Sequence, residues 1–383
     1  MMRALVTSMP IFVCAFWSVL LLLDLLEGGN KSKRGLLAYM LTTCGLYFAH
    51  YTFFNRLVTL LPYADSFYGF ANPAVYPLYY LYIREVTLPQ GNKSARWVLL
   101  PSLLCGVSIG ILYALMSPEE TASFISTYLY KTSNERLDGL ALAQVWAHGA
   151  YKQLFGLQIP LIAFLLFRHI HSFNRQVEAN FANIDNKKLR LANTILILFT
   201  ILAVISFVSS NIIGREKFFN SPFRLTISSS MYSILIFMIG YVGYRQEFTI
   251  KDLQKEQESP SAQSKPDEAE PGAYKRLSQS IDQLVDSKQL YLRPDLKISD
   301  IASELHTNRA YIYQAINIYQ GVSFAEYINR RRIAYAMQLF RKDPQRDIPE
   351  TALKCGYSSL SSFYRNFRLY QGGSPKEYCT SVL

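Results

Sequence analysis

The feature that most constrains this chain is a series of long apolar runs that fills its first 245 residues. Crossing the hydrocarbon layer of a bilayer takes about 20 mostly apolar residues in a helix, because every backbone donor and acceptor must be paired within the segment. Residues 1–245 are therefore predicted to form a seven-helix transmembrane bundle. The predicted spans are Thr7–Leu26, Leu36–Phe54, Phe67–Ile83, Trp97–Met116, Gly149–Phe167, Asn193–Ile213 and Thr226–Tyr244.

The third and the first of these runs differ from a simple apolar span. The third is short and contains Pro73 and Pro77, and proline within a bundled membrane helix usually marks a kink. The first resembles a signal peptide in position, but no small-residue cleavage site follows it, and Asp24 and Glu27 close it. A retained helix is the favoured interpretation.

The distribution of basic residues predicts the orientation of the bundle, because cytoplasmic loops hold the excess of Lys and Arg. The loops after the first, third and fifth spans hold eleven, and the opposite side, with the N-terminus, holds seven. The first set is Lys31, Lys33, Arg34, Arg84, Lys93, Arg96, Arg168, Arg175, Lys187, Lys188 and Arg190; the second is Arg3, Arg56, Lys131, Arg136, Arg215, Lys217 and Arg224. The N-terminus is thus predicted outside and the region after residue 245 in the cytoplasm.

Several polar and aromatic side chains fall inside the spans. The candidate lining of a ligand pocket consists of Asn72, Tyr76, Tyr79 and Tyr80, because polar groups within a membrane are costly unless they face a cavity or the bundle interior. The alternative is that tyrosines form interfacial belts and that polar side chains bond between helices. The outer loop 117–145 also carries Phe124, Ile125, Tyr128 and Leu129 at helical spacing. A short helix is predicted there, against the membrane or capping the bundle.

A linker is predicted at residues 246–273, where Glu, Gln, Ser, Lys and Pro replace the apolar runs. Its first part, Gln246–Glu258, has the composition of a charged stalk that continues the last span. Ser259–Gly272, with three prolines, is predicted to be disordered.

Residues 274–383 have the composition of a basic module, with 16 Lys and Arg against 10 Asp and Glu, a net charge of +6. Such a module suits nucleic acid, although a positive surface can simply aid solubility. The chain has five cysteines, none at metal-ligand spacing. No metal or cofactor is expected.

Two helix-turn-helix patterns occupy this module. In the first, Ile298, Ile301, Ala302 and Leu305 predict a short helix, His306–Asn308 a turn, and Arg309–Ile318 a second helix that Gly321 ends. In the second, Ile348, Ala352 and Leu353 lie on a first helix, residues 355–358 form a turn around Gly356, and Ser359–Tyr370 forms a second helix with Phe363 and Phe367 inward. Between them, Val322–Arg341 is predicted to be one long helix that sets their spacing.

The stretch Ile298–Tyr378 resembles the DNA-binding domain of AraC/XylS-type transcriptional regulators. The resemblance rests on Gly356-Tyr357-Ser358-Ser359, Ser362-Phe363-Tyr364-Arg365, Phe367 and Ser374-Pro375-Lys376-Glu377-Tyr378. It implies that bases are read by Ala310, Tyr313, Gln314, Leu360, Ser361, Tyr364 and Arg365. Arg309, Arg330, Arg331, Arg332, Arg368 and Lys376 are expected to contact phosphates, and a solvated helix face is the alternative for the three consecutive arginines.

The whole chain is similar to membrane-embedded AraC-type regulators, which implies a multi-pass protein of the bacterial inner membrane. The expected function is coupling of a membrane or extracellular signal to gene expression through double-stranded promoter DNA. Other candidate partners are RNA polymerase, a small-molecule or peptide signal, and a second copy of the chain. The alternatives are a membrane transporter or enzyme with a regulatory DNA-binding appendage, and a scaffolding receptor that has lost DNA binding. No catalytic residue is predicted.

Overall fold

The computed structural model describes residues 2–88, 93–185, 187–214, 217, 221–257 and 271–382. Within these ranges the chain is helical, apart from one antiparallel bridge between Phe181 and Lys297. It divides into two compact units. The first comprises Met1–Ile170 and Arg190–Glu247, and the second comprises His171–Leu189 and Phe248–Leu383.

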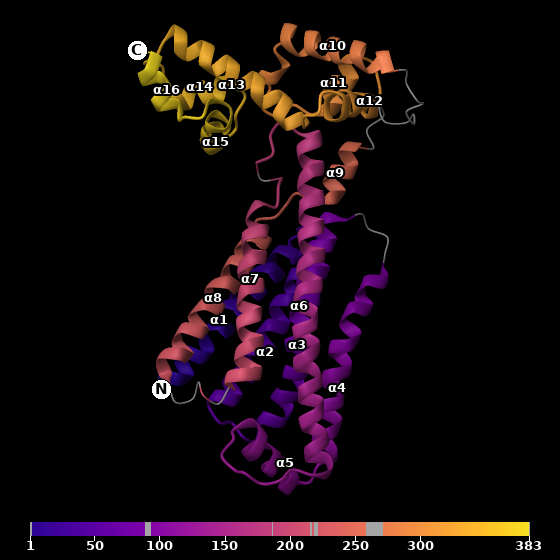
Figure 1. Cartoon of the computed structure of the whole chain (residues 1–383), viewed down its shortest axis with the longest axis vertical. Coiled ribbons are helices and arrows are strands. Elements are labelled where there is room, and N and C mark those ends of the chain that lie inside the picture. The colour runs from indigo at the N-terminus through magenta and orange to yellow at the C-terminus, as the bar shows by residue number, and fades with distance from the viewer. Residues whose placement is uncertain are drawn as a thin grey trace. The chain divides into compact units, whose positions relative to one another are not determined.

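The first unit is a bundle of long helices that run alongside one another, with the short α5 at one end (Figure 1). The elements in chain order are α1 (Met2–Leu26), α2 (Lys33–Phe54), α3 (Leu61–Thr87), η1 (Lys93–Leu99), α4 (Leu100–Leu115), α5 (Pro118–Phe124), η2 (Ile125–Leu129), α6 (Gly139–Asn180), α7 (Arg190–Val208), η3 (Ser209–Ile213) and α8 (Pro222–Tyr244). From His171 onward, α6 belongs to the second unit.

Five of these helical stretches are long and apolar enough to cross a membrane: Met2–Leu26, Arg96–Leu115, Gly139–Asn180, Leu191–Ile212 and Pro222–Tyr244. The predicted second and third spans exist as the helices α2 and α3 but are less apolar. Their packing gives a reason, because α2 packs against both α1 and α3, and α3 also packs against α4. A helix surrounded by other helices exposes less of its surface to lipid and tolerates more polar and tyrosine residues.

The predicted short helix in the outer loop is confirmed. Ser117 begins α5 with a reciprocal capping box to Glu120, and the wider turn η2 follows. Phe124, Ile125 and Leu129 are buried in one cluster with Phe53 and Phe54 of α2. This loop therefore covers the end of the bundle at which α2 ends.

The second unit contains the short helix α9 and an all-helical domain. Its elements are α9 (Ile250–Gln257), α10 (Pro271–Ser287), η6 (Leu290–Leu292), α11 (Ile298–Glu304), α12 (Arg309–Tyr313), η7 (Gln314–Tyr319), α13 (Phe324–Lys342), α14 (Ile348–Lys354), α15 (Leu360–Gln371) and α16 (Pro375–Val382). The predicted stalk is a separate helix rather than a continuation of α8, which ends at Tyr244. Most of the segment predicted to be disordered lies outside the described residues, but Pro271 and Gly272 already belong to α10.

Two hydrophobic cores build the helical domain, and α13 contributes to both. Phe324, Tyr327 and Ile328 pack into the core of the first helix-turn-helix unit. Ile333 and Phe340, further along the same helix, pack into the second. The predicted long helix between the two units is confirmed, and it joins them as a shared structural element.

Candidate nucleic-acid interface

The first helix-turn-helix unit consists of α11, a turn and the helix α12, which continues into η7. The backbone of His306 in the turn is left-handed, with φ of 48°. Asn308 then caps α12 by accepting a hydrogen bond from the Ala310 amide at 2.9 Å. Ile312 is fully buried, whereas Tyr313 beside it is 37% exposed. The helix thus buries one face and presents the other, as a reading helix requires.

The second unit consists of α14, the turn around Gly356, and α15. Ser359 caps α15 by accepting a hydrogen bond from the Ser362 amide at 3.2 Å. Phe363 and Phe367 are fully buried, which confirms their predicted inward direction, and Leu360 is 42% exposed. This helix also has a buried side and an accessible side.

Gly356 shows why this turn needs glycine. Its φ is +80°, and a Cβ at this position would lie 2.6 Å from the carbonyl oxygen of Leu292. A side chain would meet both left-handed strain and a clash with backbone. The turn of the second unit is therefore pressed against η6, which precedes the first unit.

Arg332 was predicted to contact phosphate, but its side chain points into the domain. Its side chain is buried, with 1% exposed, and donates hydrogen bonds to the carbonyl oxygens of Tyr291 at 2.6 Å and Arg293 at 2.7 Å. Burial lowers its pKa to about 10, which leaves it charged at neutral pH, and it lies over the ring of Tyr357. Since α13 points this residue inward, Arg332 joins the two helix-turn-helix units and is unavailable to DNA.

The other two arginines of the triplet lie closer to the surface. Arg331 forms ion pairs with Asp282 at 2.6 Å and Asp286 at 2.8 Å on α10, and it lies over the ring of Tyr327. Arg330 is exposed and pairs with Glu326 one turn earlier. Only Arg330 therefore matches the solvated helix face considered for the triplet.

Two predicted base-reading residues already have partners. Gln314 accepts a hydrogen bond from the hydroxyl of Tyr274 on α10. Arg365 donates to the hydroxyl of Ser362 at 2.6 Å and to the carboxylate of Asp185 at 3.4 Å. The contact with Asp185 was not anticipated from the sequence.

Asp185 belongs to a stretch at the end of α6, Asn180–Asp185, which we name the docked segment. Within the second unit, the docked segment contacts both helix-turn-helix units. The Asn180 side chain accepts hydrogen bonds from Arg309, and the side-chain amide of Asn183 donates to the hydroxyl of Ser358. These contacts could not be predicted, because the segment has no apolar periodicity and its partners lie more than 100 residues away in the chain.

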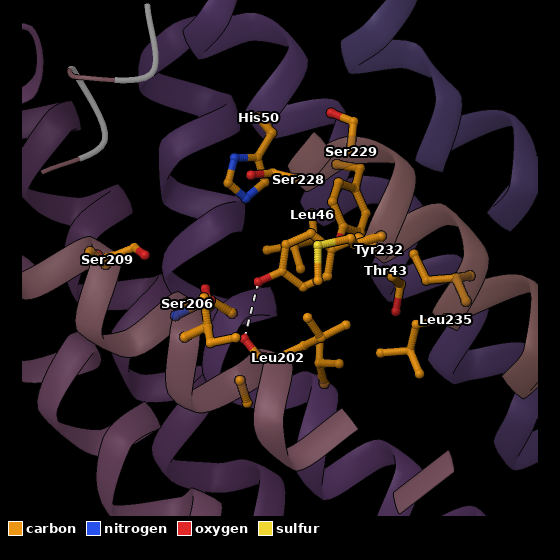
Figure 2. Close-up of a pocket in the computed structure, with 18 of the residues that line it drawn as sticks. Thr43, Leu46, His50, Leu202, Ser206, Ser209, Ser228, Ser229, Tyr232 and Leu235 are labelled. Atoms are coloured by element: carbon orange, nitrogen blue, oxygen red, sulfur yellow. Dashed lines mark hydrogen bonds between the residues drawn. The ribbon is translucent and has the colours of Figure 1, made fainter. Parts of the chain in front are cut away.

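The first unit contains a partly open cavity of about 200 Å³ between α1, α2, α3, α6, α7 and α8, which we name the bundle cavity (Figure 2). Of the four residues predicted to line a pocket, Asn72 and Tyr76 line it. Tyr79 and Tyr80 do not: the ring of Tyr79 packs near those of Tyr39 and Phe199, and Tyr80 faces His169. Residues on one helix point in different directions, so nearness in sequence did not place all four in one cavity.

A buried polar cluster in the first unit was also not predicted. Asp65 on α3 accepts hydrogen bonds from the Tyr113 hydroxyl at 2.8 Å and contacts His148 Nε2 at 2.7 Å. Both Asp65 and His148 are almost fully buried. The three residues come from α3, α4 and α6, so only the fold brings them together, and they join these helices through groups that are costly to leave unpaired.

Comparison with known proteins agrees with this geometry. Residues 289–381 match the family model described as a helix-turn-helix domain. The transcriptional regulatory protein HptR of Staphylococcus aureus strain NCTC 8325 is 27% identical over 99 residues, which are 26% of this chain and 38% of HptR. An uncharacterized HTH-type transcriptional regulator of strain MSSA476 is 28% identical over 98 residues, which are 26% of this chain and 13% of that protein.

The chain therefore spans well under half the length of these relatives, and the similarity concerns the C-terminal part. No solved structure matches the chain. The matched range begins just before η6 and ends within α16, and it includes both helix-turn-helix units with the helix that joins them. The C-terminal part of this chain is an AraC-type helix-turn-helix domain.

Proposed function

We propose that this protein is a membrane-anchored, sequence-specific transcription regulator that couples a membrane or extracellular signal to gene expression. One observation carries the proposal: a single chain combines an AraC-type helix-turn-helix domain with helices long and apolar enough to cross a membrane. DNA must then be engaged close to the bilayer. The signal is proposed to enter through the first unit, where Asn72 and Tyr76 line the bundle cavity.

The dimensions of the domain support DNA reading at two adjacent sites. The helix α13 has 19 residues, so it is about 28 Å long at 1.5 Å per residue. Successive major grooves on one face of a duplex are about 34 Å apart. A shared helix of this length suits two reading helices that enter neighbouring groove segments.

We assign base reading to the outer faces of the two reading helices. Tyr313, Leu360, Ser361 and Arg365 support this because each is exposed. Ala310, Gln314 and Tyr364 are intermediate in exposure and complete the set. Phosphate contacts are proposed for Arg309, Arg330, Arg331, Arg368 and Lys376, which supply affinity rather than sequence information.

We propose seven membrane spans, with the N-terminus outside and the helix-turn-helix domain in the cytoplasm. The five most apolar helices provide the basis, and the interhelical packing of α2 and α3 supports counting them as well. The excess of Lys and Arg in alternating loops supports the orientation.

The test of DNA reading uses the full chain in lipid nanodiscs, incubated with duplexes of random sequence and followed by sequencing of the retained DNA. We expect enrichment of a motif with two parts separated by about one helical turn, roughly 10 base pairs. Retention without enrichment of any sequence would favour a receptor that only scaffolds other proteins.

A further inference from the structure

The bundle cavity has a polar end and an apolar end. His50 lies near the end of α2, Ser209 begins η3, and Ser228 and Ser229 lie in the first third of α8. Since neighbouring helices alternate in direction, all these positions fall near the same end of the bundle. Figure 2 shows His50, Ser228 and Ser229 on one side of the cavity, with Leu202 and Leu235 on another.

The tyrosines deeper in the cavity offer ring faces more than hydroxyl groups. The Tyr76 hydroxyl donates to the carbonyl oxygen of Phe199 at 2.7 Å, and the Tyr232 hydroxyl donates to that of Leu202 at 3.2 Å. The rings of Tyr76 and Phe199 are stacked 4.2 Å apart. Away from the serine-rich end the cavity therefore presents mainly aromatic and aliphatic surface, together with the polar side chains of Thr43, Asn72 and Ser206.

Charge is missing from the lining. Among the described residues that line the bundle cavity, none is Asp, Glu, Lys or Arg. An ionised ligand group without a partner would lose its hydration at high cost in this setting, whereas a hydroxyl or carbonyl group can bond to serine hydroxyls. The cavity is also far larger than the roughly 10–15 Å³ that a cavity needs in order to hold one water molecule.

From this arrangement we infer that the bundle cavity binds an uncharged amphiphile, with a hydroxyl or carbonyl head at the serine-rich end and a short alkyl or ring body against the tyrosines. The inference rests on the proposed function, since it names the chemical class of the signal. In the proposed topology, the serine-rich end is the outer end. The ligand is thus a molecule that reaches the protein from outside or from the outer leaflet.

The test is photolabelling of the full chain in nanodiscs with octanol that carries a diazirine on its alkyl chain. The matched probe is the corresponding octanoic acid at neutral pH, where it is ionised. We expect saturable labelling of α7 and α8 peptides by the alcohol and at least about tenfold weaker labelling by the acid, from the cost of burying its charge. The double variant Ser228→Ala/Ser229→Ala should lower alcohol labelling about fivefold through lost hydrogen bonds.

Ser108→Ala is the matched control, because Ser108 is exposed on α4 and does not line the cavity. Equal labelling by alcohol and acid overturns the inference. Labelling that does not saturate and that spreads over α4 also overturns the inference, because it would mean that the alcohol only partitions into the bilayer. Neither labelling result depends on DNA binding. The selection of random DNA duplexes, carried out on the same nanodisc preparation, tests the proposed function separately.

A second inference comes from the docked segment, through contacts independent of the cavity. Its middle is built into the first helix-turn-helix unit: Ala182 is 1% exposed within that core. The Ala182 amide donates to the carbonyl oxygen of Leu296 at 3.1 Å, and its own carbonyl oxygen accepts from the Asn329 side chain at 3.4 Å. The segment is therefore held by backbone pairing and burial, as an added piece of the fold.

Its last residue lies at the start of the second reading helix. The Asp185 carboxylate accepts hydrogen bonds from the hydroxyls of Ser359 at 2.7 Å and Ser362 at 3.2 Å, and from Arg365 at 3.4 Å. An anion at a helix N-terminus, bound by hydroxyls and a guanidinium, occupies the kind of position in which a DNA phosphate binds. At the other end of the segment, Asn180 engages Arg309, a proposed phosphate contact.

We propose that the docked segment competes with DNA for the reading surface and holds the regulator in an inactive state. The segment connects α6 to α7, so it is covalently continuous with two candidate membrane-spanning helices. A signal that displaces the segment would free the side chains of Arg309, Ser359 and Arg365 from Asn180 and Asp185. The path of the signal to the DNA-binding domain then runs through this connection and does not require a rigid linker after α8.

The first test compares Asp185→Ala with Glu178→Ala in the full chain in nanodiscs. Each variant removes one negative charge, but Glu178 pairs with Lys188, whereas Asp185 bonds to residues of the second reading helix. The probe is a fluorescent duplex of mixed sequence, about 20 base pairs long to cover two groove segments. We expect Asp185→Ala to bind about tenfold more tightly than the wild type, and Glu178→Ala to change affinity less than about twofold.

Equal effects of the two variants would assign the change to overall charge and overturn the proposal, as would an unchanged affinity of Asp185→Ala. If neither the wild type nor either variant binds the duplex, the proposed DNA-binding function itself is wrong. A second test uses Asp185→Cys/Ser359→Cys, oxidised to lock the segment in place. The oxidised form should not bind the duplex and the reduced form should; equal binding by both forms also contradicts the proposal.

Discussion

At the residue scale, two arginines that lie two positions apart on α13 have different surroundings. Arg330 and Arg332 belong to one basic triplet, yet Arg330 is exposed and Arg332 is buried. The composition of the triplet identified a basic surface but did not indicate which side chain the helix turns inward. Only the packing of α13 against η6 and the second unit determines that.

We predict that Arg332→Ala destabilises the domain by about 3 kcal/mol, because it removes a fully buried side chain and leaves the carbonyl oxygens of Tyr291 and Arg293 without their donor. Arg330→Ala should cost less than about 0.5 kcal/mol, since exposed ion pairs contribute little. Hydrogen exchange of the α13 amides in the full chain measures both. A similar loss of protection in the two variants would contradict the structural role of Arg332.

The reading helix α15 permits a prediction about specificity. Arg365→Ala should relax the preference at one base position and cost about 1–3 kcal/mol on the preferred sequence. Arg368→Ala should weaken binding to all sequences and lower the salt dependence by about one counterion. Competition binding with single-base variants of the selected site separates the two. Losing the contact between Arg365 and Asp185 would change the affinity for all DNA sequences equally. An equal loss of affinity for every sequence in Arg365→Ala would therefore refute the base-reading role of Arg365.

At the scale of elements, the helices of the DNA-binding domain follow closely from the sequence, because caps and apolar spacing are local signals. Asn308 and Ser359 each cap the helix that they precede. The predictions were weaker where partners are distant. The Asp65–His148 contact joins α3 to α6, and the docked segment joins the end of α6 to α12 and α15, so no local pattern marked either one.

The turn before α15 allows a matched pair of glycine substitutions. Gly356→Ala should lower the free energy of unfolding of the second unit by about 3 kcal/mol. The alanine would have to adopt a left-handed backbone conformation, and its Cβ would clash with the Leu292 carbonyl oxygen. Gly372→Ala should cost about 1 kcal/mol, because its φ is +77° but no atom lies within 4 Å of the added Cβ. Exchange protection of the α14 and α15 amides reports the difference. Equal losses would show that the close approach to η6 is unimportant.

At the scale of the whole molecule, the number of spans depends on whether α2 and α3, which are less apolar than the other five long helices, also cross the bilayer. If α2 and α3 both failed to span, the parity would not change, and the C-terminal domain would remain on the same side. A reporter fused after α8 therefore cannot distinguish five spans from seven. The loop between α2 and α3 can.

We predict that Val58→Cys, an exposed position in that loop, reacts with a membrane-impermeant maleimide added to intact cells. Glu27→Cys, in the exposed loop after α1, should react only after permeabilisation. The reason is that α2 must cross the bilayer to bring residue 58 to the outer side. Protection of Val58→Cys in intact cells would reduce the number of spans to five.

The place of Ala182 in the core of the first helix-turn-helix unit has a consequence for how this regulator could be activated by proteolysis. Cutting the chain between α9 and α10 severs the covalent connection to the last membrane helix. The domain would still be held by the docked segment, which stays attached to α6 and α7. Release of the domain from the rest of the chain would thus need both a cut and an undocking, so protease cleavage alone would not free it.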